Sequence, residues 1–207
     1  MAANYDRTAW FYDRLSYLVF GKAQVNAQSY FLNLISPGSR ILIVGGGTGR
    51  ILEILAANHP TGLHITYVEV SANMTALARR RKAGHNHVEF IIADINSYTS
   101  TVPFDAIITA FLFDNFTEER LQQTFAHLHQ QLKPNGIWLD TDFQLTGPFW
   151  QRLMLQSMYL FFKIWGAVQV AGLPDTSKLF NRYQYLLSGQ KTFFGKFISA
   201  KAYRRQA

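Results

Sequence analysis

The sequence has no cysteine, so disulfide bonds and thiol nucleophiles are excluded. It is also poor in charge: charged residues make up only 16% of the chain, and 20 basic residues outnumber 13 acidic ones. No histidine has a partner at the spacing of metal ligands, and no Ser-His-Asp arrangement is evident. We therefore predict neither a metal site nor a hydrolytic triad.

Segments that target or span a membrane are also missing. Residues 1–7 lack the charged and apolar regions of a signal peptide, so we expect a cytoplasmic protein. Residues 147–171 are unusually apolar, but polar side chains interrupt them too often for a transmembrane helix. The interrupting residues are Gln151, Arg152, Gln156 and Lys163. An amphipathic or buried helix fits this stretch better.

What the chain does contain is enough residues for one well-buried α/β domain. Its 207 residues carry a net charge of +7 and 15% aromatic side chains, which describes a basic, aromatic-rich globular protein. The densest basic run, Arg79 to Lys82, closes an expected helix, where positive charge interacts favourably with the helix dipole. We therefore expect a small-molecule substrate and no nucleic-acid partner.

A strand, a glycine loop and a helix follow one another between residues 41 and 55. Residues 41–44 are all apolar, which predicts a strand buried on both faces, and residues 51–55 have helical periodicity. The glycines between them let the backbone approach a ligand, and free N–H groups at the helix start can hold a polar group. A dinucleotide fingerprint needs a glycine where Arg50 stands, so a nicotinamide cofactor is disfavoured.

Acidic residues end the next two expected strands. Glu69 comes twenty residues after Gly49, where a carboxylate can accept hydrogen bonds from both ribose hydroxyls of a nucleoside. Asp94 follows the apolar run of residues 88–93 and is placed to meet an adenine amino group. A glycine loop, a ribose acid and an adenine acid are therefore expected on three successive strands.

With this order of motifs, residues 38 to 143 resemble the class I S-adenosylmethionine-dependent methyltransferases, in particular the small-molecule type that acts on quinones and lipids. The resemblance implies a Rossmann-like, seven-stranded, mostly parallel sheet in the order 3-2-1-4-5-7-6, with the last strand antiparallel and helices on both sides. It also implies S-adenosylmethionine as the cofactor. The implied cofactor-binding residues are Gly45, Gly46, Gly47, Thr48, Gly49, Glu69, Val70, Asp94, Ile95 and Ala110.

One position departs from the family pattern. An acidic residue usually stands two positions before the first glycine, and this sequence has Ile43 there, which leaves the methionine end of the cofactor with one partner fewer. Aminopropyltransferases of the spermidine synthase type also carry an apolar residue there, so they remain an alternative. A non-catalytic module that binds S-adenosylmethionine is the third.

We expect residues 1–207 to form a single domain with four parts. Residues 1–37 would form a helical cover, residues 38–143 the cofactor-binding core, residues 144–182 lid helices over the substrate, and residues 183–207 the closing strands. The oligomeric state is expected to be a monomer or a homodimer.

Methyl transfer demands positioning of the acceptor, and a base only where the acceptor must lose a proton. Asp114, which follows the fourth strand, and Tyr12, in the cover, are the catalytic candidates. Aromatic residues gather at both expected rims of the site: Tyr5, Trp10, Phe11 and Tyr12 at one, and residues 149–165 at the other, including Phe161 and Trp165. We therefore expect an apolar or aromatic acceptor, such as a quinone, a phenol or a lipid-like molecule, and a peripheral contact with a membrane.

Overall fold

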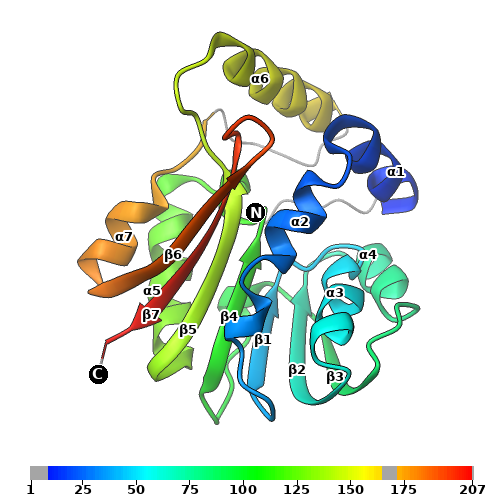
Figure 1. Cartoon of the computed structure of the whole chain (residues 1–207), viewed down its shortest axis with the longest axis vertical. Coiled ribbons are helices and arrows are strands. Elements are labelled where there is room, and N and C mark those ends of the chain that lie inside the picture. The colour runs from blue at the N-terminus through cyan, green and yellow to red at the C-terminus, as the bar shows by residue number, and fades with distance from the viewer. Residues whose placement is uncertain (1–8, 165–171, 207) are drawn as a thin grey trace.

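The computed structural model describes residues 9–164 and 172–206, where a single seven-stranded sheet lies between two layers of helices (Figure 1). The strands are β1 (Arg40–Val44), β2 (Thr61–Glu69), β3 (His85–Ile92), β4 (Phe104–Ala110), β5 (Leu132–Phe143), β6 (Tyr185–Phe193) and β7 (Ile198–Arg205). The α-helices are α1 (Ala9–Phe20), α2 (Ala23–Ser29), α3 (Arg50–Asn58), α4 (Ala72–Ala78), α5 (Glu118–Gln131), α6 (Phe149–Ile164) and α7 (Thr176–Arg182). Three single-turn 3₁₀ helices are η1 (Leu32–Leu34), η2 (Ile95–Ser97) and η3 (Phe113–Asn115).

The order of the strands is β3-β2-β1-β4-β5-β7-β6, as the resemblance predicted. Strands β1 to β5 run parallel to one another, whereas β7 pairs antiparallel with both β5 and β6. In this order β1 and β4 are adjacent, and their ends mark the point where the connections change direction along the sheet. Open α/β sheets bind their ligands beyond the carboxyl ends of the strands at such a point.

Strand β1 is buried on both faces because its side chains supply two separate cores. Ile41 and Ile43 belong to the core under η1 and α3, whereas Leu42 and Val44 belong to the core under α5 and α7. All four side chains are buried. The continuous apolar run thus has the physical cause expected for a central parallel strand.

Local sequence patterns predict a turn at His85 and His87, a turn at residues 133–136 and a helix over residues 72–83, and the structure differs at all three places. His85 and His87, expected in a turn, belong to β3, because the left-handed Gly84 lets the His85 N–H donate to the Pro60 carbonyl (2.7 Å) and start the strand early. The turn expected at residues 133–136 lies inside β5, where the left-handed Asn135 and a register shift against β4 absorb it. The helix expected from residue 72 to 83 ends at Ala78 and closes with 3₁₀-type bonds.

A third core covers the carboxyl ends of the strands. Helices α1 and α6 lie at this end of the molecule, above the sheet (Figure 1). They pack with α2 and with the ends of β5 and β7 around Phe20, Phe143, Leu155 and Phe197. Phe31 contacts both this core and the core under α3, so it links the cover to the sheet. The positions of α1 and α6 enclose a space above the ends of β1 and β4.

Candidate active site

A cleft of about 670 Å³ lies between the carboxyl ends of the strands and the helices α1 and α6. The glycine loop after β1 and the ends of β2 and β4 form its floor, and α1, α2 and α6 supply its other walls. Most residues predicted to bind the cofactor line it, together with both catalytic candidates. These lining residues are Gly45, Gly46, Gly47, Thr48, Glu69, Val70, Asp94, Ile95, Ala110, Asp114 and Tyr12.

Each glycine of the loop is favoured at its position for a different physical reason. A Cβ on Gly46 would lie 2.4 Å from the Tyr67 ring, and one on Gly45 would lie 2.8 Å from Leu112 Cδ1. Gly47 is different, since no atom of the described residues lies within 4 Å of its Cβ position, but its φ of +60° favours glycine. The loop therefore packs closely underneath and leaves open space at Gly47 on the cleft side.

Gly49 does not line the cleft, unlike the other predicted loop residues. It has a φ of +80°, and a Cβ there would lie 2.6 Å from Cα and Cβ of Ala78 at the end of α4. Gly49 therefore allows α3 and α4 to approach each other. Its direct contact with a cofactor stays a prediction, and its observed neighbours give it a packing role.

Glu69 holds the glycine loop in place. Its Oε2 accepts a hydrogen bond from the Gly47 N–H (3.0 Å), and its Oε1 accepts one from the Ser71 N–H (2.9 Å). Tyr67 lies two residues earlier on the same face of β2, and its hydroxyl donates a hydrogen bond to the Gly47 carbonyl (2.8 Å). The carboxylate lies at the cleft wall with two backbone bonds, which orient it beside the loop.

Asp94 lies at the start of η2 and forms an ion pair with Arg120 from α5 (2.7 Å). Burial raises the pKa of Asp94, but hydrogen bonds from Arg120 and from the Asn96 N–H outweigh it and hold the pKa below its usual range. Arg120 also lies over the Phe116 ring, 4.7 Å from its centroid. Asp94 is therefore an ionised acceptor at one wall of the cleft, next to Ile95.

Asp114 faces the cleft from η3, and a second carboxylate lies behind it. Asp142, at the end of β5, accepts a hydrogen bond from the Asp114 N–H (3.2 Å), and the Asn115 amide donates to Asp114 Oδ1 (2.5 Å). Burial is the main cause that raises the pKa of Asp114 to about 7. Burial and the charge of Asp114 raise the pKa of Asp142 well above its usual range. Asp114 is therefore partly protonated near neutral pH.

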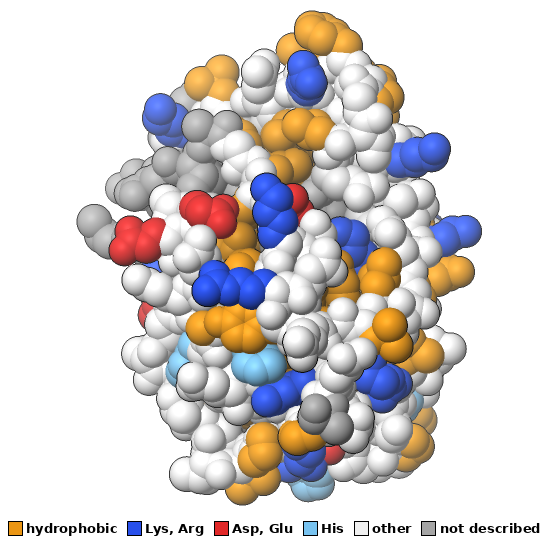
Figure 2. Space-filling model, turned by 90° about the vertical axis from the view of Figure 1, so that its left-hand side faces the viewer, with side chains coloured by type: hydrophobic (Ala, Val, Ile, Leu, Met, Phe, Trp, Pro, Cys, Tyr) orange, Lys and Arg blue, Asp and Glu red, His pale blue; other side chains and the backbone are white. Residues whose placement is uncertain are grey.

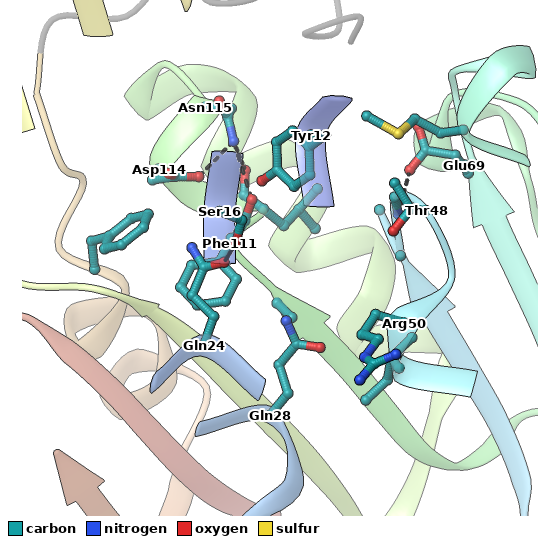
Figure 3. A pocket seen from close by; sticks show the side chains of 18 of the residues that line it. Tyr12, Ser16, Gln24, Gln28, Thr48, Arg50, Glu69, Phe111, Asp114 and Asn115 are labelled. Atoms are coloured by element: carbon teal, nitrogen blue, oxygen red, sulfur yellow. Dashed lines mark hydrogen bonds between the residues drawn. The ribbon is translucent and has the colours of Figure 1, made fainter. Parts of the chain in front are cut away.

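Tyr12 reaches this pair from α1. Figure 3 shows its ring beside Asp114 and Asn115, with the hydroxyl on their side of the cleft. Burial, followed by the charges of Asp114 and Asp13, raises the pKa of Tyr12 well above its usual range. The phenol is therefore neutral at physiological pH and can donate a hydrogen bond, but it is a poor base.

Helix α1 is fastened to the glycine loop by ionic and polar contacts. The Thr48 hydroxyl donates to Asp13 Oδ1 (2.6 Å), and Arg81 forms an ion pair with the same carboxylate. Arg81 Nε also donates to the Thr48 carbonyl (3.0 Å). These three residues come from the cover, the loop and the segment after α4, so the cover and the cofactor loop are joined directly.

Sequence reasoning missed a group of polar side chains from the cover and α3. Ser16, Gln24, Gln28 and Arg50 line the cleft, and Figure 3 shows Gln28 and Arg50 approaching the same space. Gln24 and Gln28 are one helical turn apart on a helix otherwise packed by apolar residues, which is a signal that the sequence offered. Ile43 also lines the cleft but has no polar group, whereas these four side chains supply polar groups there.

Some aromatic residues of the expected rims can be placed. Phe11 and Phe161 meet edge to face, with ring centroids 6.4 Å apart, so α1 and α6 contact each other above the cleft. Phe161 lines the cleft together with Met154 and Met158 from the same helix. Tyr5, Trp165 and the side chain of Trp10 lie outside the described residues.

The geometry and the comparisons define the class of protein. Residues 41–136 match the family model of a methyltransferase domain. The strand order and the glycine loop are those expected of the class I fold. Residues 41–136 therefore form a methyltransferase domain, and the sheet that contains them has the fold of the class I S-adenosylmethionine-dependent methyltransferases.

Two curated relatives are similar over part of this chain. A demethylmenaquinone methyltransferase of Clavibacter sepedonicus is 31% identical over 139 residues, which cover 66% of this chain and 55% of the relative. A cyclopropane-fatty-acyl-phospholipid synthase of Escherichia coli strain K12 is 28% identical over 105 residues, which cover 51% of this chain and 26% of the relative. The chain thus spans about half, or less, of the length of these relatives.

A solved structure shows the same fold over nearly the whole chain. The 1,6-didemethyltoxoflavin-N1-methyltransferase of Burkholderia thailandensis, with S-adenosylhomocysteine bound, aligns with a TM-score of 0.68. The alignment has 13% identity and covers 98% of this chain and 86% of that protein. At this identity the likeness concerns the fold.

The described ranges contain neither a membrane-spanning helix nor a cluster of metal ligands. Between residues 9 and 164 and between 172 and 206, no helix is long and apolar enough to cross a membrane. In the same ranges, no three histidine or carboxylate side chains converge as metal ligands would.

Proposed function

We propose that this protein transfers a methyl group from S-adenosylmethionine to a small apolar or aromatic acceptor. The observation that carries the proposal is the composition of one continuous cleft. One part is built from the glycine loop, Glu69 and Asp94, and the other from apolar side chains of the strand ends, α1 and α6. A volume of about 670 Å³ is within the usual range for a ligand site.

The first part of the cleft fits the cofactor. The space at Gly47 admits a ligand against the loop backbone, and Glu69 and Asp94 present carboxylates at the ends of the neighbouring strands β2 and β3. The carboxylates that line the cleft, Asp13, Glu69, Asp94 and Asp114, outnumber the cations there, Arg50 and Arg120, in a protein whose net charge is +7. A cationic sulfonium is favoured by such carboxylates, because opposite charges attract strongly where water is excluded.

The second part fits an apolar acceptor. Phe111, Phe143 and Phe161 line it with Met154 and Met158, and methionine adapts to ligands of varied shape. Burying an apolar group against such walls gives roughly 25 cal/mol per Å² of surface removed from water. The names of the two curated relatives denote a quinone precursor and a phospholipid, which supports the same class of acceptor.

The chemistry requires little from the protein beyond position and, for some acceptors, a base. S-Adenosylmethionine supplies an electrophilic methyl group: an acceptor lone pair or carbanion bonds to the methyl carbon while the carbon–sulfur bond breaks and its electron pair stays on sulfur. For an acceptor that must lose a proton, Asp114 takes it, since its pKa of about 7 leaves a large ionised fraction at neutral pH. Tyr12 orients the acceptor as a neutral hydrogen-bond donor.

The two other hypotheses from the sequence have less support. An aminopropyltransferase would have to bind a polycationic amine along the acceptor part of the cleft, and α6 lines that part mainly with Met154, Met158 and Phe161 and with no carboxylate. A non-catalytic module would not need a buried carboxyl such as Asp114, whose pKa is raised to about 7, at the wall of the cleft. Methyl transfer uses both features.

The test is a methyl-transfer assay with isotopically labelled S-adenosylmethionine on a panel of quinols, phenols and amines. We expect transfer to the apolar acceptors, and we expect Phe161→Ser to raise their KM about tenfold while the Kd for S-adenosylmethionine is unchanged. The matched control is Leu186→Ser, an exposed apolar residue on β6. Turnover restricted to hydrophilic amines would refute the acceptor class, and no binding of S-adenosylmethionine would refute the function.

A further inference from the structure

We propose that the outer faces of α1 and α6 dock on an anionic lipid surface, so that the cleft between them receives its acceptor from the lipid phase. The entry of the acceptor from the lipid phase rests on the proposed function, whereas the docking itself is a separate property of the surface. The evidence is that α1 and α6 both expose large apolar side chains, with basic side chains beside them, on the sides turned away from the sheet.

Helix α6 presents an apolar outer face between two cations. Phe149, Leu153 and Leu160 are 77%, 57% and 63% exposed, although they are large apolar side chains. Gln151 and Leu155, on the opposite side, are buried. Arg152 and Lys163 are exposed near the two ends of the same face. If α6 only packed against the core of the protein, its large apolar side chains would be buried and not exposed.

Helix α1 repeats the pattern on the other rim of the cleft. Tyr17 and Leu18 are 62% and 82% exposed, and Arg14 and Lys22 are exposed one helical turn before and after them. Tyr17 also lines the cleft, so this apolar patch continues into its mouth. The two helices meet at Phe11 and Phe161, which makes their exposed faces parts of one end of the molecule.

The charge around these faces selects the partner. Residues 14–52 and 143–174 contain no aspartate or glutamate, although each stretch contains arginine and lysine. Asp13 is the acidic residue of α1, and its carboxylate is taken up by Thr48 and Arg81. Figure 2 shows the same asymmetry, with orange and blue side chains at the upper end of the molecule and red ones lower down.

An anionic lipid surface suits this combination better than a second copy of the chain does. In a dimer that buried the two apolar faces against their symmetry mates, Arg14, Arg152 and Lys163 would face like charges. At an anionic bilayer, the apolar side chains enter the boundary between headgroups and acyl chains, and each lysine or arginine gains from the negative surface potential. Shallow interfacial binding therefore satisfies both the apolar and the basic residues.

The experiment is sedimentation of the full-length protein with vesicles of phosphatidylcholine alone or mixed with phosphatidylglycerol. We expect binding that depends on the anionic lipid and weakens as salt is added. Leu18→Ser and Leu160→Ser should each weaken it at least about fivefold. Arg152→Gln and Lys163→Gln should each weaken it by about fivefold. Circular dichroism and calorimetry with S-adenosylmethionine should show all four variants folded and cofactor-competent.

The matched controls are Leu186→Ser and Lys178→Gln, an exposed leucine on β6 and an exposed lysine on α7. They should leave vesicle binding unchanged. The proposal is overturned if vesicles are not bound, if the controls weaken binding as much as the α1 and α6 variants do, or if Leu160→Ser instead dissociates a dimer in sedimentation equilibrium. Failure to bind vesicles by a protein that still methylates dissolved phenols would refute the docking and leave the proposed function standing.

Discussion

At the scale of single residues, burial changes the acid strength of Asp114. Its carboxyl lies beside Asp142 and Asn115 at the cleft wall, and burial raises its pKa to about 7. If it is the base, the rate with a phenol acceptor should rise with pH and level off above about 7. Asp114→Asn should lower this rate roughly 10²- to 10⁴-fold, the usual contribution of a positioned base. The measurement is kcat/KM against pH.

The control for this prediction is Glu119→Gln, an exposed carboxylate in the first turn of α5. It should keep the rate and the pH profile of the parent protein. An Asp114→Asn variant with the same profile and nearly the same rate would show that Asp114 is no base.

The same shift predicts how stability depends on pH. Because folding raises the pKa of Asp114 above its unfolded value, the folded state holds the extra proton more tightly, and this contribution to stability is complete below pH 4. The free energy of unfolding from this group should fall as pH rises from about 4 to about 7. Urea titrations at several pH values should show a smaller fall for Asp114→Asn, and an identical fall would contradict the burial of the carboxyl.

Glu69 carries the prediction for cofactor binding. If its carboxylate accepts hydrogen bonds from the ribose, Glu69→Ala should weaken binding of S-adenosylmethionine by about 1.5–3 kcal/mol, the scale of hydrogen bonds to a charged group. Calorimetry measures the change. Because Glu69 also accepts hydrogen bonds from the N–H groups of Gly47 and Ser71, the change should lower the Tm as well, which a thermal melt measures. Glu69→Gln, which keeps the size, should lose part of the affinity with a smaller loss of stability.

At the scale of elements, the glycine loop works as a closely packed floor. Gly46→Ala would place a Cβ 2.4 Å from the ring of Tyr67, which is buried and hydrogen-bonded to the Gly47 carbonyl. We expect it to destabilise the protein by about 1–3 kcal/mol, as overpacking of a tight site does. Gly172→Ala is the matched control, because within the described part of the chain no atom lies within 4 Å of the added Cβ and the φ of Gly172 is not left-handed. Urea unfolding of both variants decides the point.

At the scale of the whole molecule, the cover and the sheet should unfold together. Phe31 joins the two cores, and the contacts of Asp13 with Thr48 and Arg81 join α1 to the loop and to the segment after α4. We expect one calorimetric transition, and S-adenosylmethionine at 100 times its Kd should stabilise the protein by about 2.7 kcal/mol. A separate early transition for the cover, unaffected by the cofactor, would refute the prediction of a single domain for residues 1–207.

The sequence by itself determined the elements whose signals are local. The apolar run of β1, the glycines after it and the acids Glu69 and Asp94 at strand ends are contiguous patterns that indicate most of the cleft floor, and the sheet order followed from the family resemblance that they carry. Such patterns reflect burial and backbone freedom over a few residues, which neighbours in sequence already fix. Boundaries were less certain, as β3 and the turn inside β5 show.

Only the tertiary structure decided which distant side chains meet. Asp142 lies behind Asp114 because β5 pairs with β4, and Asp13 reaches Arg81, 68 residues away, because α1 crosses the glycine loop. The packing role of Gly49 likewise depends on how close α4 comes to α3. No local pattern encodes these distances, since they follow from how the elements pack. The raised pKa of Asp114 and the fastening of the cover are therefore properties of the folded chain.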